Sequence, residues 1–259
     1  MNAVFYDAVR PMFGGKLTEA QVRGMDGIFK AFRAVGDGDV DTLAYVLATA
    51  YHETGRRMIP VREGFASTDA GARKAVANLA AKRGPNSAVA KYSKPAGPYG
   101  HVYYGRGHPQ LTWIYNYESA SADAGVDLVK DPDAMLDPVI SARVLIRGVM
   151  DGRWNGRGKG IAYYEGDDDF LDDEEAAEAR RTVNGKDKAV AIAGYHRKFY
   201  DALQLAGAAK SMAMHTTVIA EIPAATAPKA PPAILPPAMG LNWLERLVAA
   251  LVAWSRKGK

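Results

Sequence analysis

Hydrophobic positions recur every three or four residues through the first part of the chain, the spacing of helices with one buried side. Residues 2–35 carry two such patterns, and Thr18 is placed to cap the second. After a glycine-rich break, Asp39 or Asp41 can cap a third helix that ends near Gly55. The hydrophobic positions of this third helix are Val40, Leu43, Ala44, Leu47, Ala50 and Tyr51.

Glu53 falls in the final turn of the predicted third helix. A step of seven residues turns a helix by nearly two full turns, so Glu53 has nearly the same angular position as Val46. A carboxylate at the edge of a hydrophobic face is partly desolvated, which disfavours its charged form, and general acids are made in this way. The helix position alone leaves open an exposed glutamate without a role.

The periodic signal fades between residues 57 and 107. Residues 58–65 are predicted to be extended and a helix is predicted from about residue 69 to 81, while prolines and glycines punctuate the rest. An irregular stretch of this length in a compact domain is typical of a functional loop or of disorder. Because flat rings stack on the apolar faces of pyranose units, four tyrosines here predict a sugar-binding wall: Tyr92, Tyr99, Tyr103 and Tyr104.

Three further helical patterns follow. Residues 138–150 are strongly hydrophobic and predict the buried centre of the fold. The acidic run at 167–175 is best explained as carboxylates at the N-terminus of a helix that ends at Asn184 and Gly185. A last helix is predicted from about residue 188 to 206.

The composition changes after Gly207, where prolines interspersed with alanine predict a semi-rigid polyproline linker. The last residues combine helical hydrophobic spacing with a cationic end, which favours an amphipathic helix at a membrane surface. A helix that docks on the domain or on a partner stays open. The predicted organisation is a main domain at 1–207, a Pro/Ala-rich linker at 208–238 and an amphipathic cationic helix at 239–259.

The formal net charge of +4 suits an anionic partner such as a bacterial cell wall, but no basic stripe interleaved with aromatic residues indicates nucleic acid. The absence of cysteine excludes disulfides and thiolate chemistry, and the N-terminus lacks the pattern of a secretory signal. His52 and Glu53 begin a zinc-protease pattern, but Arg56 stands where the second histidine is needed. We therefore expect no metal and no cofactor.

Three separated segments resemble glycoside hydrolase family 19, the chitinase-like and endolysin branch of the lysozyme-like superfamily. They are His52–Gly55, then Tyr103–Gly107 with Gln110–Trp113 and Asn116–Tyr117, and finally Arg180–Gly185. The segments occur in the family's order, and the resemblance covers roughly residues 40–205. It implies a mainly α fold: a lysozyme-like, two-lobed helical domain with a substrate cleft, which would make residues 1–207 the catalytic domain.

The resemblance also implies a set of site residues. Glu53 would be the general acid that protonates the leaving oxygen. Polar side chains would hold the substrate or the attacking water: Gln110, Thr112, Asn116 and Asn184. Thr112 stands where the family has serine or threonine. The same segments add Tyr104, Arg106, Trp113 and Arg181 to the predicted substrate-binding set.

For the second carboxylate, the general base, we select Glu63, with Asp69 as the fallback. Arg62 and Arg106 could keep Glu63 ionised while Glu53 stays protonated. An inverting mechanism needs the two carboxyl groups roughly 6.5 to 9.5 Å apart, so that a water fits on the far face of the sugar.

This constellation implies hydrolysis of a β-1,4 bond next to an N-acetylated aminosugar. The absence of cysteine and of a signal favours a peptidoglycan-degrading bacteriophage endolysin, made in the host cytoplasm and reaching the periplasm and cell wall during lysis. The alternatives are a chitinase, and a non-catalytic wall-binding or virion structural protein. We expect a monomer that binds polysaccharide and no nucleic acid, with membrane contact through 239–259 left open.

Overall fold

The computed structural model describes residues 1–155, 157–166 and 170–208. By its contacts the chain divides into two units, Met1–Val218 and Ile219–Lys259, and all described residues belong to the first. Apart from Ala208, the predicted linker and the predicted C-terminal helix lie outside the described residues. No helix within the described ranges is long and hydrophobic enough to span a membrane.

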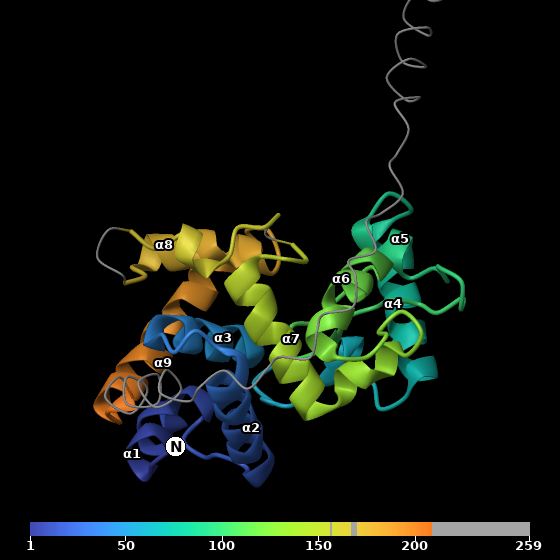
Figure 1. Cartoon of the computed structure of the whole chain (residues 1–259). Helices are drawn as coiled ribbons and strands as arrows, with labels where there is room; N and C mark the ends of the chain where they lie inside the picture. Colours follow the sequence, from blue (N-terminus) through green and yellow to red (C-terminus); the bar gives the residue numbers. More distant parts are fainter. Residues whose placement is uncertain (156, 167–169, 209–259) are drawn as a thin grey trace, which may run out of the picture. The chain divides into compact units, whose positions relative to one another are not determined.

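The described part of the chain is mainly helical, as predicted (Figure 1). Its α-helices are α1 (Ala3–Val9), α2 (Glu19–Val35), α3 (Val40–Glu53), α4 (Asp69–Arg83), α5 (Ala88–Tyr92), α6 (Ile114–Ala124), α7 (Pro138–Asp151), α8 (Asp173–Glu178) and α9 (Ala189–Leu205). Short 3-10 helices are η1 (Arg10–Phe13), η2 (Glu63–Phe65), η3 (Pro132–Leu136), η4 (Ile161–Tyr163) and η5 (Ala179–Thr182). Two short strands, β1 (Val61–Arg62) and β2 (Arg106–Gly107), complete the fold.

The predicted caps of α2 and α3 are confirmed. The Thr18 side chain accepts from the backbone of Gln21, and the Gln21 side chain binds back to Thr18, which forms a capping box. Asp39, rather than Asp41, caps α3 by accepting from two backbone N–H groups. Gly55 follows the end of α3 with a φ of +56°, a conformation that glycine adopts without strain.

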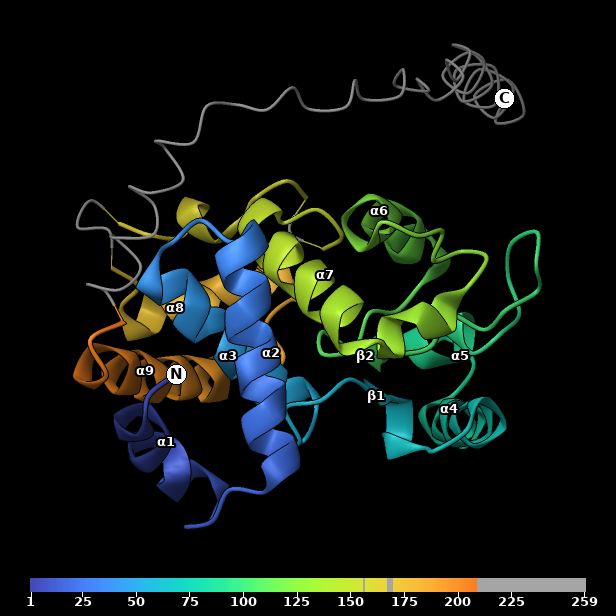
Figure 2. The same ribbon diagram turned by 60° about the horizontal axis from the view of Figure 1, so that its bottom comes forward.

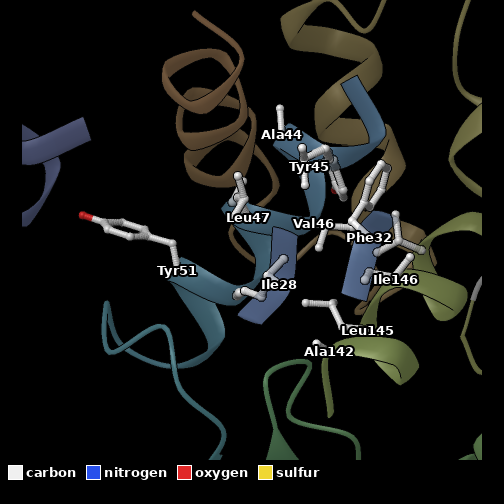
Figure 3. Close-up of a cluster of buried hydrophobic side chains, with 14 of the residues drawn as sticks. Ile28, Phe32, Ala44, Tyr45, Val46, Leu47, Tyr51, Ala142, Leu145 and Ile146 are labelled. Carbon is white, nitrogen blue, oxygen red and sulfur yellow. The ribbon is translucent and has the colours of Figure 1, made fainter. Parts of the chain in front are cut away.

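Helix α3 lies at the centre of the main hydrophobic cluster (Figure 3), where side chains of α2, α3 and α7 meet. All twelve residues from Val40 to Tyr51 are buried, so this helix is enclosed on every side. It packs chiefly against α9. The burial of α7 confirms that residues 138–150 form a core helix. Glu53 therefore extends from the end of a rigid, enclosed element.

A smaller hydrophobic cluster lies around α4 and α5, separate from the main one. In Figures 1 and 2, α7 lies between the group of α1, α2, α3, α8 and α9 and the group of α4, α5 and α6. The antiparallel pairing of Val61 with Gly107 and of Arg62 with Arg106 joins the chain just before Glu63 to the end of the Tyr103–Gly107 segment. This pairing replaces the extended stretch predicted at 58–65, because only two residues of that stretch form a strand.

The helix that follows the acidic run at 167–175 is also shorter than predicted. Helix α8 ends at Glu178 and the chain continues as the tighter η5 to Thr182, so Arg180 is presented from a 3-10 turn. The N-cap is Asp172, in a capping box with Glu175, as expected for an acidic helix start. Helix α5 was not predicted, since five residues are too few to give a periodic signal.

Candidate functional site

Glu53 and Glu63 line one open cavity of about 480 Å³. The cavity is bounded by the end of α3, the start of η2, helices α4 and α5, the segment from Pro109 into α6, and two later loops. Six of the other residues predicted from the sequence line it as well: Tyr92, Gln110, Thr112, Trp113, Asn116 and Asn184. Segments that are far apart in the sequence thus meet around two carboxylates.

Glu53 is held by a buried arginine. Nη2 of Arg180 donates to Oε1 of Glu53 at 2.5 Å, and the side chains are 1 % and 14 % exposed respectively. Nε of Arg180 donates to the backbone carbonyl of Asp187, which fixes the guanidinium from its other side. The hydrophobic spacing around Glu53 predicted a position at the edge of a hydrophobic face and gave no indication of Arg180 as its partner.

Glu63 is held by neutral donors instead. The Tyr92 hydroxyl donates to Oε1 at 2.7 Å, and the Gly105 backbone N–H donates to Oε2 at 2.8 Å. Burial, followed by the charge of Glu63, raises the pKa of Tyr92, so this phenol stays a protonated donor. The two donors fix both oxygens of the carboxylate in place.

The predicted pairing of Glu63 with Arg62 and Arg106 is wrong. Arg62 donates to Asp133 at 2.6 Å, and Arg106 donates to Asp133 at 2.8 Å and to Asp69 at 3.3 Å. The strand pairing places both guanidinium groups in an ionic cluster with Asp69 and Asp133 outside the cavity lining, in which Arg106 is buried and both carboxylates are partly exposed. Asp69 belongs to that cluster, so the structure places Glu63, not the fallback Asp69, in the cavity.

The side chains of Gln110 and Glu63 lie close to Gly105. A Cβ added at Gly105 would lie 2.8 Å from Oε1 of Gln110 and 3.3 Å from Oε2 of Glu63. Nε2 of Gln110 donates to the carbonyls of Val61 and Gly107, which leaves the amide oxygen as the free end. A side chain at 105 would therefore have to displace the Gln110 amide, which two hydrogen bonds hold in place.

The backbone of this segment is strained. Gln110 and Trp113 have φ values of +51° and +73°, in the left-handed region that side chains other than glycine rarely adopt. Backbone strain of this kind concentrates at binding and catalytic sites, where the surrounding structure imposes it.

The side chains of Thr112 and Asn116 differ in what they bind. Nδ2 of Asn116 donates to the carbonyl of Thr112 at 2.8 Å, while the Thr112 hydroxyl forms no hydrogen bond with any described residue.

Three aromatic side chains line the cavity as a connected group. Trp113 meets Tyr92 edge-on with ring centres 5.5 Å apart, and stacks on Tyr115 at 5.8 Å with an interplanar angle of 21°. Tyr115 is 57 % exposed and was not predicted; its position two residues after Trp113 was the available signal.

The predicted tyrosine wall is wrong for three of its four members. Tyr103 and Tyr104 are buried, and their hydroxyls donate to the Val129 carbonyl and to Asp69. Tyr99 is exposed but lies outside the cavity lining. Tyr92 alone faces the cavity. The tyrosine pattern could not distinguish core rings from cleft rings.

Three of the predicted substrate-binding residues also lie outside the cavity lining. The guanidinium of Arg106, 2 % exposed, packs 3.6 Å over the ring of the buried Tyr104, so both support the fold and neither is available to a substrate in this structure. Arg181 is exposed and pairs with Glu178 at 2.8 Å. Its neighbour Arg180, not predicted as a site residue, is the arginine that reaches Glu53.

A family model and the curated relatives point to the same protein family. Residues 19–155 match the model of the family described as chitinase class I. An endochitinase of Persea americana is 36 % identical over 84 residues, 27 % of this chain and 26 % of that protein. Inactive chitinase-like protein 1 of Hevea brasiliensis is 31 % identical over 152 residues, 51 % of this chain and 46 % of that protein. The chain thus spans less than half the length of these curated relatives.

Two solved structures also align. A bacterial family 19 chitinase gives a TM-score of 0.47 at 22 % identity, covering 78 % of this chain and 94 % of that chain. Chitinase C of Streptomyces griseus HUT6037 gives 0.43 at 21 % identity, covering 80 % and 78 %.

Proposed function

Because this chain belongs to the chitinase class I family, glycoside hydrolase family 19, we propose that it hydrolyses a β-1,4 bond next to an N-acetylated aminosugar. One observation carries the proposal: Glu53 and Glu63 line a single cavity but have different partners. A charged arginine holds Glu53, and two neutral donors hold Glu63. Two carboxylates in distinct environments are what acid and base roles require.

In the proposed mechanism Glu53 protonates the leaving oxygen and Glu63 takes a proton from the attacking water, with inversion at the anomeric carbon. The fixed orientation of Glu63 supports its role as base, since both oxygens are already held by donors. Inversion requires a separation of roughly 6.5 to 9.5 Å between the two carboxyl groups. Arg180 would stabilise the anion that Glu53 becomes after it gives up its proton.

The remaining polar side chains supply positioning. The Thr112 hydroxyl and the free amide oxygen of Gln110 are suited to hold the attacking water near Glu63, while Asn116 and Asn184 are suited to hold the N-acetyl groups of the substrate. Trp113 offers a ring for stacking on a pyranose. These contacts orient the scissile bond, which is a large part of what a two-carboxylate enzyme must do.

For the substrate we favour peptidoglycan, and for the role a bacteriophage endolysin. The net charge of +4 and the cationic sequence at 239–259 suit an anionic cell envelope. Chitin is the alternative, favoured by the relatives named endochitinase. A non-catalytic wall-binding role is the second alternative, because one relative is named as inactive. Action as a monomer is part of the proposal.

Turbidity of Gram-negative cells stripped of their outer membrane tests the activity. The wild-type protein should clear the suspension, whereas Glu53→Gln and Glu63→Gln should each lower the rate by about 10²- to 10⁴-fold, the range for a general acid or base. Glutamine keeps an oxygen that can accept from Arg180 but removes the charge that compensates it, so the control for folding is a cooperative thermal transition above the assay temperature. Equal clearing by Glu53→Gln would refute the mechanism.

Mass analysis of the products then identifies the bond. New reducing ends on peptidoglycan support the endolysin, and cleavage of chitohexaose alone supports the chitinase. For the tail, removal of residues 239–259 should abolish liposome binding if the segment is a membrane-surface helix. Retained liposome binding would contradict that role.

A further inference from the structure

Arg83 is the only cationic side chain among the described residues that line the cavity. It is the last residue of α4, and Leu79, one helical turn earlier on the same face, also lines the cavity. Gly84 ends the helix with a φ of +87°, and the Ser87 hydroxyl binds back to the Gly84 carbonyl at 2.7 Å before capping α5. The ordered turn therefore fixes the backbone position of Arg83 at the edge of the cavity.

The guanidinium of Arg83 has no ion pair or hydrogen bond with any described residue. In contrast, Arg62 and Arg106 in the ionic cluster with Asp69 and Asp133 are each paired with carboxylates. The charge of Arg83 is near enough to Tyr92 to act on its phenol, and Tyr92 binds Glu63. Arg83 thus presents an uncompensated positive charge on the Glu63 side of the cavity.

The rest of the cavity lining carries the opposite charge. Glu53, Glu63 and Asp187 supply carboxylates, and only Glu53 has a cationic partner. These carboxylates would repel an anionic group along most of the cavity, while Arg83 would attract one. A polysaccharide with an anionic substituent can therefore bind favourably only in a register that brings that substituent to Arg83.

We propose that Arg83 binds a carboxylate carried by the sugar chain, and so selects an anionic glycan over neutral chitin. This inference rests on the proposed function, and it deepens it by naming the substrate class and the register. In peptidoglycan every second sugar carries a lactyl ether whose peptide stem bears free carboxylates, whereas chitin has none. The substituted sugar then lies on the wall formed by the end of α4 and by α5.

The test compares Arg83→Gln with wild type on three soluble substrates: peptidoglycan strands with their peptide stems, the same strands with the carboxylates amidated, and chitohexaose. Lys82→Gln is the matched control, since Lys82 is an exposed neighbour on α4 that does not line the cavity. Binding of the same ligands is measured separately in the Glu53→Gln background, so that affinity is read without turnover.

Arg83→Gln should lower kcat/KM and affinity for the native strands by about fivefold, as for an exposed ion pair, mainly through KM. It should leave the values for the amidated strands and for chitohexaose the same as in wild type, because neither ligand offers a carboxylate to Arg83. The wild-type preference for native strands should weaken with added salt, and Lys82→Gln should change nothing.

Equal losses on all three substrates would overturn the inference, because Arg83 would then act through Tyr92 and Glu63. No loss on the native strands would overturn it as well. A protein that cleaves none of the substrates refutes the proposed function separately. In that case, tighter binding of native than of amidated strands, lost in Arg83→Gln, still supports the inference, and equal binding overturns it.

Discussion

Nη2 of Arg180 lies 2.5 Å from Oε1 of Glu53, although 127 positions separate the two residues in the chain. Glu53 ends the enclosed helix α3, and Arg180 comes from the short η5 after α8. The contact ties the start of the domain to its last third at the cavity. Arg180 is almost fully buried, so its charge depends on this one carboxylate for compensation.

Removal of Arg180 should destabilise the fold. Arg180→Met leaves Glu53 without its cation and the Asp187 carbonyl without its donor, and we expect a loss of about 3 kcal/mol, the lower end for breaking a buried pair. The free energy of unfolding in urea measures it. Arg180→Lys keeps the charge and should lose less. A change below about 0.5 kcal/mol in Arg180→Met, the range of ordinary surface substitutions, would show that the pair carries no stability.

The Tyr92 hydroxyl should matter for turnover rather than for folding. Tyr92→Phe removes the donor to Oε1 of Glu63 but keeps the ring that meets Trp113. We expect kcat to fall about tenfold, the effect of one hydrogen bond to a charged group, with KM little changed. Tyr99→Phe, on an exposed ring outside the cavity lining, is the control. If Tyr92→Phe and Tyr99→Phe are equally active, the Tyr92 hydroxyl does not contribute to turnover.

His108 should make the fold sensitive to acid. Its backbone N–H donates to Ser141 Oγ, so the Ser141 hydroxyl can donate to Nδ1 while Nε2–H donates to the Met58 carbonyl, which is the neutral form of the ring. Complete burial lowers the pKa of His108 from 6.5 to about 4. Because the folded pKa lies below the unfolded one, stability is fully present above pH 6.5 and is lost as the pH falls toward 4.

Between pH 7 and pH 4, the contribution of His108 to the free energy of unfolding should fall by about 3 kcal/mol. Other groups titrate in this range too, so the measurement compares urea unfolding of wild type and of His108→Gln at both pH values. Glutamine stays neutral, so the stability difference between the two proteins should shift by that amount. A difference that does not change with pH would contradict the burial of a neutral ring.

Tyr45→Phe should leave stability unchanged or raise it. The Tyr45 hydroxyl is buried and finds no hydrogen-bond partner within the described residues, and burial raises its pKa, so the phenol stays neutral. A buried donor without a partner costs roughly 1 to 3 kcal/mol, and phenylalanine keeps the ring in the core. Thermal unfolding measures the change. A clear loss of stability would show that the hydroxyl is bonded, with Nη1 of Arg180, also buried and without a partner among the described residues, as a candidate donor.

The sequence by itself determined the elements that depend on local rules. Hydrophobic spacing and capping residues located α2, α3, α7 and α9, since caps and periodicity act within a few residues. It also selected Glu53, Gln110, Thr112, Asn116 and Asn184 as members of one site, because the order of three motifs resembled a family whose model the chain matches. Their catalytic roles remain predictions.

Only the tertiary structure decided the partners of each charge. Arg62, Arg106 and Tyr104 have the residue types of a binding site, yet the pairing of β1 with β2 brings them to Asp69 and Asp133, outside the cavity lining. Arg180 reaches Glu53, and Arg83 and Tyr115 reach the cavity, only through the packing of elements distant in sequence. Spacing along a chain reports which side of an element a residue occupies. The charged group that contacts this residue from another element depends on the packing of the whole domain.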